Sequence, residues 1–370
     1  MPLKYRAAVL HAAQTPLSIE TVIAADLKPS DALVRIRATG LCHTDLEVID
    51  GSLRYPMPIV LGHEAAGIVE QVGTAARGLK AGDHVVLSWN PHCGHCFYCD
   101  RDTPILCEEY LGKGPQAVAF DGGSRATLAD GGGLGQLMFL GSFGEYCIVS
   151  DQQAVAVPKE IPFDRACLIG CGVMTGVGAA LNLNAIARGD SVMVIGCGAV
   201  GLSAVQGARL AGAAIIIAVD LDPAKLALAA KMGATHGVDA SKDDAVAAGK
   251  RETAGRGVDV VIESAGSASA FRITTEAVRP GGQIIWLGKI DVAKDVAFRW
   301  GSMMQEKRIR RVSYGNTRPR RDFPLLARAY LDGSLLLDDL ISRRIKLDEI
   351  NDGFAALRRG EAIRSVVMFD

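Results

Sequence analysis

Residues 58–73, PIVLGHEAAGIVEQVG, set His63 beside Glu64 between an apolar run and a glycine-containing segment. Packing in a protein core does not by itself call for an ionisable pair at such a position. A single histidine there can also be a buried side chain whose hydrogen bonds are satisfied. The choice between the two interpretations depends on which other metal-binding residues the chain carries.

Two cysteines complete a ligand set with this histidine. Cys42 lies upstream in GLCHTD (residues 40–45), and Cys171 lies far downstream in IGCG (residues 169–172). Two thiolates and one imidazole leave a tetrahedral zinc ion with one open position, which is the composition of a catalytic zinc site. The sequence therefore predicts that Cys42, His63 and Cys171 bind a catalytic zinc ion.

The totals indicate a globular protein of two domains. The chain has 370 residues, and single cores rarely grow beyond about 250 to 300 residues. Its hydrophobic content of 49%, charged content of 22% and net charge of −1 are ordinary, and they give no field that would attract nucleic acid or an anionic membrane. One basic cluster, residues 307–311 with Arg318, Arg320 and Arg321, could be a local phosphate site, but a solvated helix face is the favoured interpretation.

A cytoplasmic location is expected. The first ten residues, MPLKYRAAVL, lack the uninterrupted apolar core of a signal peptide, and the apolar run of residues 213–219 is too short to span a bilayer. In a reducing compartment, nine cysteines are better interpreted as metal ligands and buried thiols than as disulfides.

The first part of the chain has the alternating pattern of half-buried strands. The pattern is clearest over residues 32–37, and residues 83–87 form another strand that leads to Trp89. We expect an antiparallel, barrel-like module whose strands deliver Cys42 and His63 to one edge. Residues 112–137 are rich in glycine and nearly patternless, which predicts a long functional or mobile loop.

Four cysteines follow this β region in the pattern C-x2-C-x2-C-x7-C: Cys93, Cys96, Cys99 and Cys107. This spacing predicts a closed, all-cysteine structural zinc site, which stabilises a lobe with little apolar sequence of its own. Four unrelated buried cysteines are one alternative. A redox dithiol is another, although no helix-forming pattern follows these cysteines.

Beyond Cys171, strands rich in Val and Ile alternate with Ala-rich helical stretches, which predicts a doubly wound parallel sheet. The strand of residues 192–195 runs directly into GCGAVG (residues 196–201), whose Gly196, Gly198, Val200 and Gly201 would let a helix N-terminus approach a pyrophosphate. Asp220 ends the next strand and can accept from both ribose hydroxyls. An acid there repels a 2′-phosphate, so we expect NAD rather than NADP.

The motif Gly62-His63-Glu64-x-x-Gly67, with Gly73 following, closely resembles that of the zinc-dependent medium-chain alcohol dehydrogenases. Alcohol dehydrogenase is itself a standard example of the Cys2His catalytic zinc set. The resemblance covers nearly the whole chain and implies an α/β protein, a doubly wound Rossmann cofactor domain plus a mainly β, GroES-like catalytic domain. The expected boundaries are residues 1–172 and 313–370 for the catalytic domain and 173–312 for the NAD-binding domain. The implied cofactors are two zinc ions per chain and NAD.

The resemblance also implies roles for several other residues. Asp45 would orient His63, Glu64 would lie behind the zinc, and Thr44 would take the alcohol proton. Where the best-known members continue the proton relay with a histidine, this chain has Glu47, which is either the relay base or a bystander. The expected cofactor contacts outside the glycine loop are His43, Thr175 and Arg364, of which Arg364 would bind the pyrophosphate unless it is simply exposed.

The resemblance implies hydride transfer between an alcohol and NAD. The expected pocket residues are Trp89, Leu53, Phe139 and Leu140, and two bulky aromatics would suit a primary aryl or allylic alcohol. A thiol-adduct formaldehyde dehydrogenase is the alternative, suggested by residues 121–125, and a non-catalytic dinucleotide-binding protein is a remote one. A homo-oligomer, preferably a dimer, is expected, with residues 281–287 as an edge strand that could pair across a two-fold axis.

Overall fold

The computed structural model describes residues 2–370, which form two compact units. Unit 1 runs up to Cys171 and includes Arg318–Asp370, and unit 2 is Gly172–Thr317. The chain therefore leaves the first unit, builds the second, and returns.

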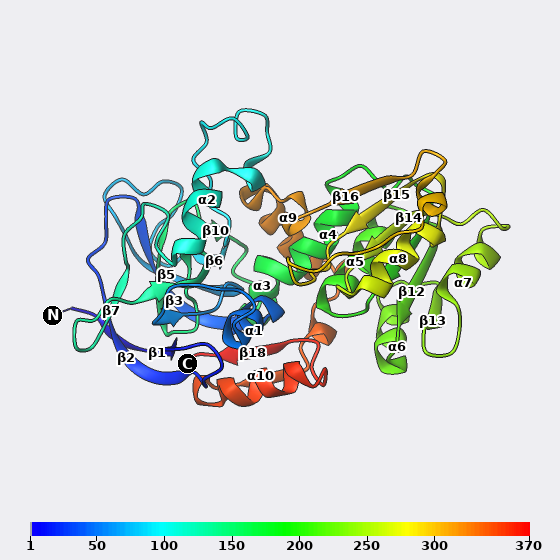
Figure 1. Ribbon diagram of the computed structural model, residues 1–370. Coiled ribbons are helices and arrows are strands. Elements are labelled where there is room, and N and C mark those ends of the chain that lie inside the picture. The colour runs from blue at the N-terminus through cyan, green and yellow to red at the C-terminus, as the bar shows by residue number, and fades with distance from the viewer. Residues whose placement is uncertain (1) are drawn as a thin grey trace. The chain divides into compact units, whose positions relative to one another are not determined.

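Unit 1 is built on two sheets (Figure 1). The five-stranded sheet has the order β7-β2-β1-β4-β8, with β7 at Ala126–Leu128, β2 at Ser18–Ala24, β1 at Lys4–Leu10, β4 at Ile59–Val60 and β8 at Gly135–Gln136. The second sheet has the order β10-β6-β5-β3-β18-β17, with β9 also paired to β3. Its strands are β10 (Ala154–Ala156), β6 (His84–Leu87), β5 (Ala65–Val72), β3 (Asp31–Gly40), β18 (Ser365–Met368), β17 (Arg343–Ile345) and β9 (Tyr146–Ser150). The predicted barrel-like β module is confirmed.

Strand β3 shows why the sequence pattern was informative. Ala32, Val34, Ile36 and Ala38 are fully buried, as the alternation of its residues predicts. The helices of this unit are α1 (His43–Asp50), α2 (Glu108–Lys113), α3 (Phe163–Leu168), α9 (Pro319–Leu331) and α10 (Ile350–Arg358). Single 3-10 turns lie at η1 (Pro104–Leu106), η2 (Gly114–Gln116), η3 (Leu137–Phe139), η7 (Asp338–Leu340) and η8 (Leu347–Glu349).

The glycine-rich residues 112–137 are not one patternless loop, which corrects the expectation from the sequence. They contain β7 and β8, which pair with β2 and β4 respectively. Each strand is only two or three residues long, so the period-2 pattern that identifies strands has no room to develop.

Unit 2 is a six-stranded parallel sheet in the order β13-β12-β11-β14-β15-β16. Numbered along the chain, this is the 3-2-1-4-5-6 order of dinucleotide-binding folds. The strands are β13 (His236–Asp239), β12 (Ile215–Asp220), β11 (Ser191–Ile195), β14 (Val258–Glu263), β15 (Val278–Trp286) and β16 (Arg308–Arg311). The helices are α4 (Met174–Leu181), α5 (Ala199–Leu210), α6 (Pro223–Lys231), α7 (Ala245–Glu252) and α8 (Ala268–Ala277), with 3-10 turns η5 (Trp300–Met303) and η6 (Tyr314–Asn316).

Two expectations about this unit are wrong. The run of residues 281–287 is not an edge strand, because β15 pairs with β14 on one side and β16 on the other. The basic residues 308–311 do not lie on a helix face, since they form β16 itself. In unit 1, Arg318 of the same basic cluster pairs with Asp102.

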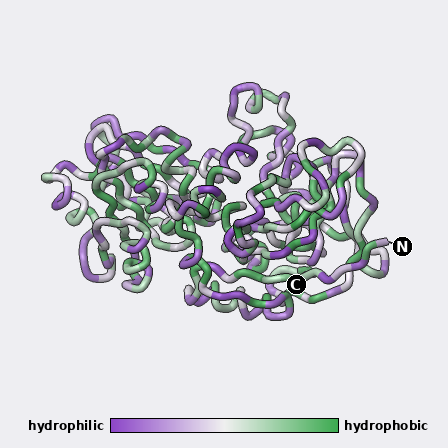
Figure 2. The backbone as a smooth tube through the Cα atoms, turned by 180° about the vertical axis from the view of Figure 1, so that it is seen from behind, coloured by the Kyte–Doolittle hydropathy of each residue, from purple (hydrophilic) through white to green (hydrophobic). Residues whose placement is uncertain are grey.

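Each unit has its own apolar core. Clusters of buried apolar side chains lie in unit 1, around Leu10 and Ile59 and around Val34 and Val85, and in unit 2 around Met193, Ile217 and Val261. Figure 2 shows hydrophobic segments within each unit and mainly hydrophilic outer loops. One helical stretch, Phe163–Leu181, is long and apolar enough to cross a membrane, but 83% of its apolar window is buried inside the protein, as expected of a core helix.

Candidate active site and zinc centres

Two of the residues expected to bind the catalytic zinc, Cys42 and His63, come together because strands β3 and β5 pair side by side. Strand β3 ends at Gly40, two residues before Cys42. Its neighbour β5 pairs Ala65 with Thr39, so His63 and Glu64 directly precede the paired residues. The ligand atoms of Cys42, His63 and Cys171 lie within 4.8 Å of one another.

Two local backbone features position the ligands His63 and Cys171. His63 follows Gly62, whose φ of +94° is a left-handed conformation that favours glycine, and a Cβ there would lie 2.6 Å from the Phe143 ring. Cys171 lies in a π-helical turn, η4 (Ile169–Val173), between α3 and α4. Such single π turns are frequent at functional sites.

The Asp45 carboxylate fixes the orientation of His63. It is fully buried, and its Oδ1 lies 3.2 Å from His63 Nδ1 and accepts from the Gly62 N–H at 2.9 Å. Its other oxygen accepts from the Cys42 N–H at 3.1 Å. With Nδ1 engaged, Nε2 is left for the thiols, as in a carboxylate–histidine–zinc arrangement.

The electrostatics of the three ligands suit a cation. The hydrogen bond with Cys171 is the main reason that the pKa of Cys42 is well below its ordinary value, against the effect of burial. Burial would lower the pKa of His63, but the charges of Asp45 and Cys42 raise it well above its ordinary value. Thiolates and an imidazole are the donors that zinc prefers, so the residues fit the metal.

Glu64 and Arg364 form a buried ion pair beside the ligands. Glu64 is fully buried and Arg364 is 4% exposed, and Arg364 Nε lies 3.1 Å from Glu64 Oε1. Arg364 Nη2 also lies 3.8 Å from Cys42 Sγ. Burial raises the pKa of Glu64 to about 7, although the charge of Arg364 opposes this shift. The alternative of an exposed arginine is therefore wrong, and the structure places its guanidinium at the zinc site.

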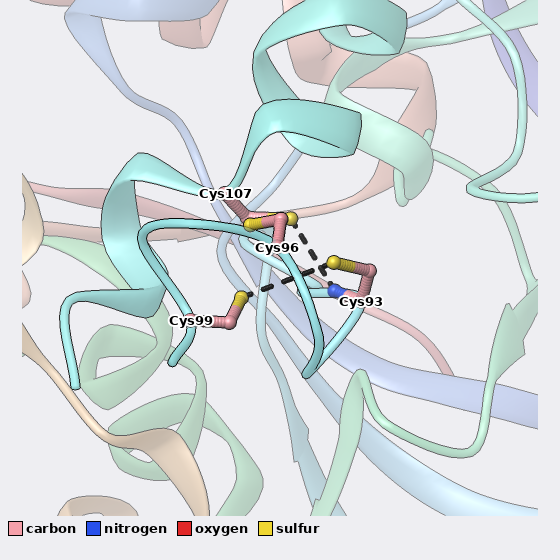
Figure 3. Close-up of side chains that lie close together, drawn as sticks. All are labelled: Cys93, Cys96, Cys99 and Cys107. Atoms are coloured by element: carbon pink, nitrogen blue, oxygen red, sulfur yellow. Dashed lines mark hydrogen bonds between the residues drawn. The ribbon is translucent and has the colours of Figure 1, made fainter. Parts of the chain in front are cut away.

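The four predicted structural ligands form a second cluster. The sulfurs of Cys93, Cys96, Cys99 and Cys107 lie within 4.8 Å of one another and face a common centre (Figure 3). Cys93 and Cys99 Sγ are 4.0 Å apart, and the Cys93 N–H donates to Cys107 Sγ at 3.3 Å. A closed four-sulfur set is the donor chemistry of structural zinc. A short helix, α2, does follow Cys107, contrary to the sequence expectation, but the convergence of four sulfurs does not fit a dithiol pair.

In unit 2 the glycine loop joins β11 to α5. A Cβ at Gly201 would lie 1.7 Å from Gly196 O, so this helix can approach the strand only with glycine there, whereas a Cβ at Gly198 would meet nothing within 4 Å. Asp220 ends β12, and its carboxylate accepts from the Cys197 N–H at 2.6 Å and from the Asp222 N–H at 3.0 Å. The loop and the acid thus lie together, as a dinucleotide site requires.

The remaining predicted residues lie on two helices. Helix α1 begins directly after Cys42, with His43 exposed and both Thr44 and Glu47 half-buried. His43 and Glu47 are four residues apart, so they lie on the same face of this helix. Thr175 is half-buried in the first turn of α4 in unit 2, and Val200 is half-buried in α5.

The four expected pocket residues differ in their surroundings. Phe139 and Leu140 are buried, with 1% and 2% exposure, Leu140 belongs to a core cluster that Trp89 packs against, and Leu53 packs against another cluster. The sequence reasoning missed Tyr110, whose ring lies between Trp89 at 6.2 Å and Phe139 at 5.5 Å. Its position three residues after Cys107 was the available signal.

Comparisons with known proteins agree with this arrangement. Residues 28–159 match the alcohol dehydrogenase GroES-like domain, and residues 199–331 match the zinc-binding dehydrogenase family. The chain is 37% identical to an NDMA-dependent alcohol dehydrogenase of Amycolatopsis methanolica, with 99% of each chain covered. It is 35% identical to an S-(hydroxymethyl)glutathione dehydrogenase of Saccharomyces cerevisiae, covering 100% of this chain and 97% of the relative. The crystal structure of benzyl alcohol dehydrogenase from Acinetobacter calcoaceticus superposes with a TM-score of 0.93 at 32% identity, with both chains fully covered.

Fold and site together define a zinc-binding oxidoreductase with a dinucleotide-binding domain. The chain belongs to the zinc-dependent medium-chain alcohol dehydrogenase family. The expected fold class, a GroES-like domain with a Rossmann domain, and the expected cofactors, zinc and NAD, are confirmed at the level of the family.

Proposed function

We propose that this protein is an NAD-linked alcohol dehydrogenase that reversibly converts a primary aryl or allylic alcohol into the aldehyde. The observation that carries the proposal is the buried set of Cys42, His63 and Cys171, which offers two sulfurs and one nitrogen and leaves a fourth metal position open. Zinc held there would act as a Lewis acid toward the alcohol oxygen. The aromatic side chains of Trp89, Tyr110 and Phe139 support an aryl substrate, and so does the likeness to a benzyl alcohol dehydrogenase.

The chain's own residues would hold the metal and handle the proton. Asp45 keeps His63 in one ring orientation. The positive charge of Arg364 balances the negative charge of the buried Glu64 carboxylate next to the ligands. Thr44 lies two residues after Cys42 and is the proposed acceptor of the alcohol proton. Glu47, one turn further along α1, is either the next proton acceptor or a bystander. Glu47→Gln should shift the pH–rate profile only if this carboxylate is the base, so an unchanged profile would remove it from the relay.

NAD is the proposed cofactor rather than NADP. The Asp220 carboxylate lies at the glycine loop, where a ribose is bound in this fold, and would accept from its hydroxyls. A 2′-phosphate would bring further negative charge to the same place, and like charges at close range repel. The neighbouring residue, Asp222, is a second acid, and it caps helix α6 by accepting from the Ala224 N–H at 2.9 Å.

A thiol-adduct formaldehyde dehydrogenase is the second candidate, favoured by the identity to S-(hydroxymethyl)glutathione dehydrogenases. The sequence of residues 121–125 suggested this activity, but the charged side chains of this segment form ion pairs with other residues of unit 1. Arg125 is 6% exposed and pairs with Asp31 and Asp121, and Lys28 pairs with Asp121 as well. These contacts support a structural role for the segment. A non-catalytic dinucleotide-binding protein is a remote third candidate, because such a protein would not need a complete Cys2His set.

The deciding experiment compares initial rates of NADH formation from benzyl alcohol with those from formaldehyde plus glutathione. Turnover of benzyl alcohol without thiol is the expected result. Turnover only with formaldehyde and thiol would favour the adduct dehydrogenase, and no turnover of either by protein that holds two zinc ions per chain would contradict both enzymes. We also propose a cytoplasmic homodimer, for which light scattering should give twice the mass of one chain.

A further inference from the structure

The row of aromatic rings beside the zinc ligands includes polar groups. Tyr110 lies between Trp89 and Phe139, and Phe139 in turn meets Phe120 at 5.6 Å, edge to face. Tyr110 belongs to α2, which starts directly after the structural ligand Cys107, and the Leu111 N–H donates to Cys107 O at 2.9 Å. The structural zinc lobe therefore fixes the position of this tyrosine.

The backbone of Phe139 is held in an uncommon conformation. Met138 and Phe139 have φ of +49° and +64°, a region that side chains other than glycine rarely adopt. The side-chain amide of Gln136 donates to Phe139 O at 2.7 Å, and that of Gln153 does so at 3.4 Å. Strained backbone that its surroundings hold in place is concentrated at binding and catalytic sites. The ring of Phe139 is thus set in place by more than core packing.

This row adjoins the catalytic zinc ligands. Trp89 and Asn90 follow β6, and a Cβ at Gly170 would lie 2.9 Å from the carbonyl oxygen of Leu87, the last residue of that strand. Gly170 directly precedes Cys171. Burial is the main cause that raises the pKa of the Tyr110 hydroxyl, so this group stays neutral at physiological pH.

The Asn90 side chain, next to Trp89 in the sequence, has hydrogen-bonding capacity to spare. Asn90 is 5% exposed, and its Nδ2 meets no acceptor at full hydrogen-bonding geometry among residues 2–370, although the Tyr110 hydroxyl lies close enough to interact with this side chain. The neutral Tyr110 phenol can both donate and accept.

We propose that Tyr110, with Asn90, forms a polar contact point within an otherwise aromatic substrate wall, and that the enzyme therefore selects aryl alcohols that carry an oxygen substituent on the ring. This inference rests on the proposed alcohol dehydrogenase function and narrows its substrate class. A phenolic or ether oxygen would accept from the Asn90 amide or the Tyr110 hydroxyl, while the substrate ring packs against Trp89 and Phe139. A site with buried donors discriminates against analogues that leave these donors unpaired.

The test compares kcat/KM for 3- and 4-hydroxybenzyl alcohol with kcat/KM for the corresponding methylbenzyl alcohols. The methyl group has a similar size and no hydrogen-bonding capacity. Wild-type enzyme should prefer at least one hydroxylated alcohol by about threefold to tenfold, the range that one neutral hydrogen bond supplies. Tyr110→Phe keeps the ring and removes the hydroxyl, so this preference should fall toward one.

Tyr146→Phe is the matched control, because Tyr146 lies on β9 and packs edge to face against Tyr5 at 5.9 Å. It should keep the wild-type preference. A wild-type preference near one overturns the proposal without any variant, and an equal change in Tyr110→Phe and Tyr146→Phe also overturns it. If no aryl alcohol is oxidised at all, the proposed function fails as well, which separates the two failures.

Discussion

Replacing Asp45 by Asn tests whether the catalytic zinc site depends on this buried carboxylate. Asp45 accepts three hydrogen bonds, from the Gly62 N–H, the Cys42 N–H and the His63 ring. Asparagine has nearly the same shape but only one acceptor oxygen, and its NH2 group must face at least one of these donors. The substitution therefore removes the charge and leaves one buried N–H without an acceptor.

The expected loss can be estimated from these contacts. A hydrogen bond to a charged group contributes about 1.5–3 kcal/mol and a neutral one about 0.5–1.5 kcal/mol. Making the His63 contact neutral thus costs about 1–2 kcal/mol, which is about fivefold to thirtyfold in zinc affinity at about 1.4 kcal/mol per factor of ten. This estimate overlaps the range of about 10- to 100-fold that is typical of residues that orient a metal ligand.

Competition with a chromogenic chelator measures this affinity, because the catalytic zinc should leave Asp45→Asn at lower chelator concentration while the four-cysteine zinc stays bound. The matched control is Asp50→Asn at the other end of α1, where Asp50 is exposed and pairs with Arg358. Its zinc affinity should be unchanged. Wild-type affinity in a correctly folded Asp45→Asn variant would refute the idea that this carboxylate holds the ligand in place.

Three further predictions concern other parts of the chain. Cys99→Ser should reduce the zinc content from two ions to one per chain and lower the thermal midpoint, since structural zinc contributes folding free energy; elemental analysis that still finds two ions would contradict the assigned site. Asp220→Ala should lower the preference for NAD over NADP, measured as a ratio of kcat/KM, by about 10- to 100-fold through loss of hydrogen bonds to a carboxylate, and an unchanged ratio would exclude Asp220 from the ribose site. Asp164 is buried, which would raise its pKa, but hydrogen bonds from Arg165 and Arg344 outweigh burial and lower the pKa. Its contribution to stability is therefore present above the unfolded pKa of about 4 and is lost as pH falls through the lower folded value. The urea midpoint of Asp164→Asn should thus fall less steeply with acidification than that of the wild type, and parallel curves for the two proteins would refute this.

The sequence predicted those parts of the site whose residues are close together in the chain. The glycine loop and Asp220 belong to one strand–helix–strand unit, and the four-cysteine cluster closes within 15 residues. Short spacing ties such residues to a local geometry, so a pattern of residue types is enough to place them. The catalytic ligands were predicted from their chemistry and the family motif rather than from spacing.

The contacts that could not be predicted connect distant parts of the chain. Arg364 lies 300 residues from Glu64, and a sequence pattern cannot show that a buried carboxylate will receive this partner. Tyr110 was missed because one aromatic residue on a short helix is usually core or surface, and only the rings around it distinguish it. The two-residue strands β4 and β8 are likewise identified by pairing rather than by their own sequence.

Strand β3 explains how these distant segments reach one place. It ends just before Cys42, it pairs with β5 beyond Glu64, and on its other side Gly40 is opposite Val366 of β18, two residues after Arg364. The arginine can therefore reach the carboxylate only after the last strand of the chain has paired. A buried charge without its partner is strongly destabilising, by about 3–5 kcal/mol. The returning segment is thus part of the zinc site, because without β18 the glutamate next to His63 would be buried without its counter-ion.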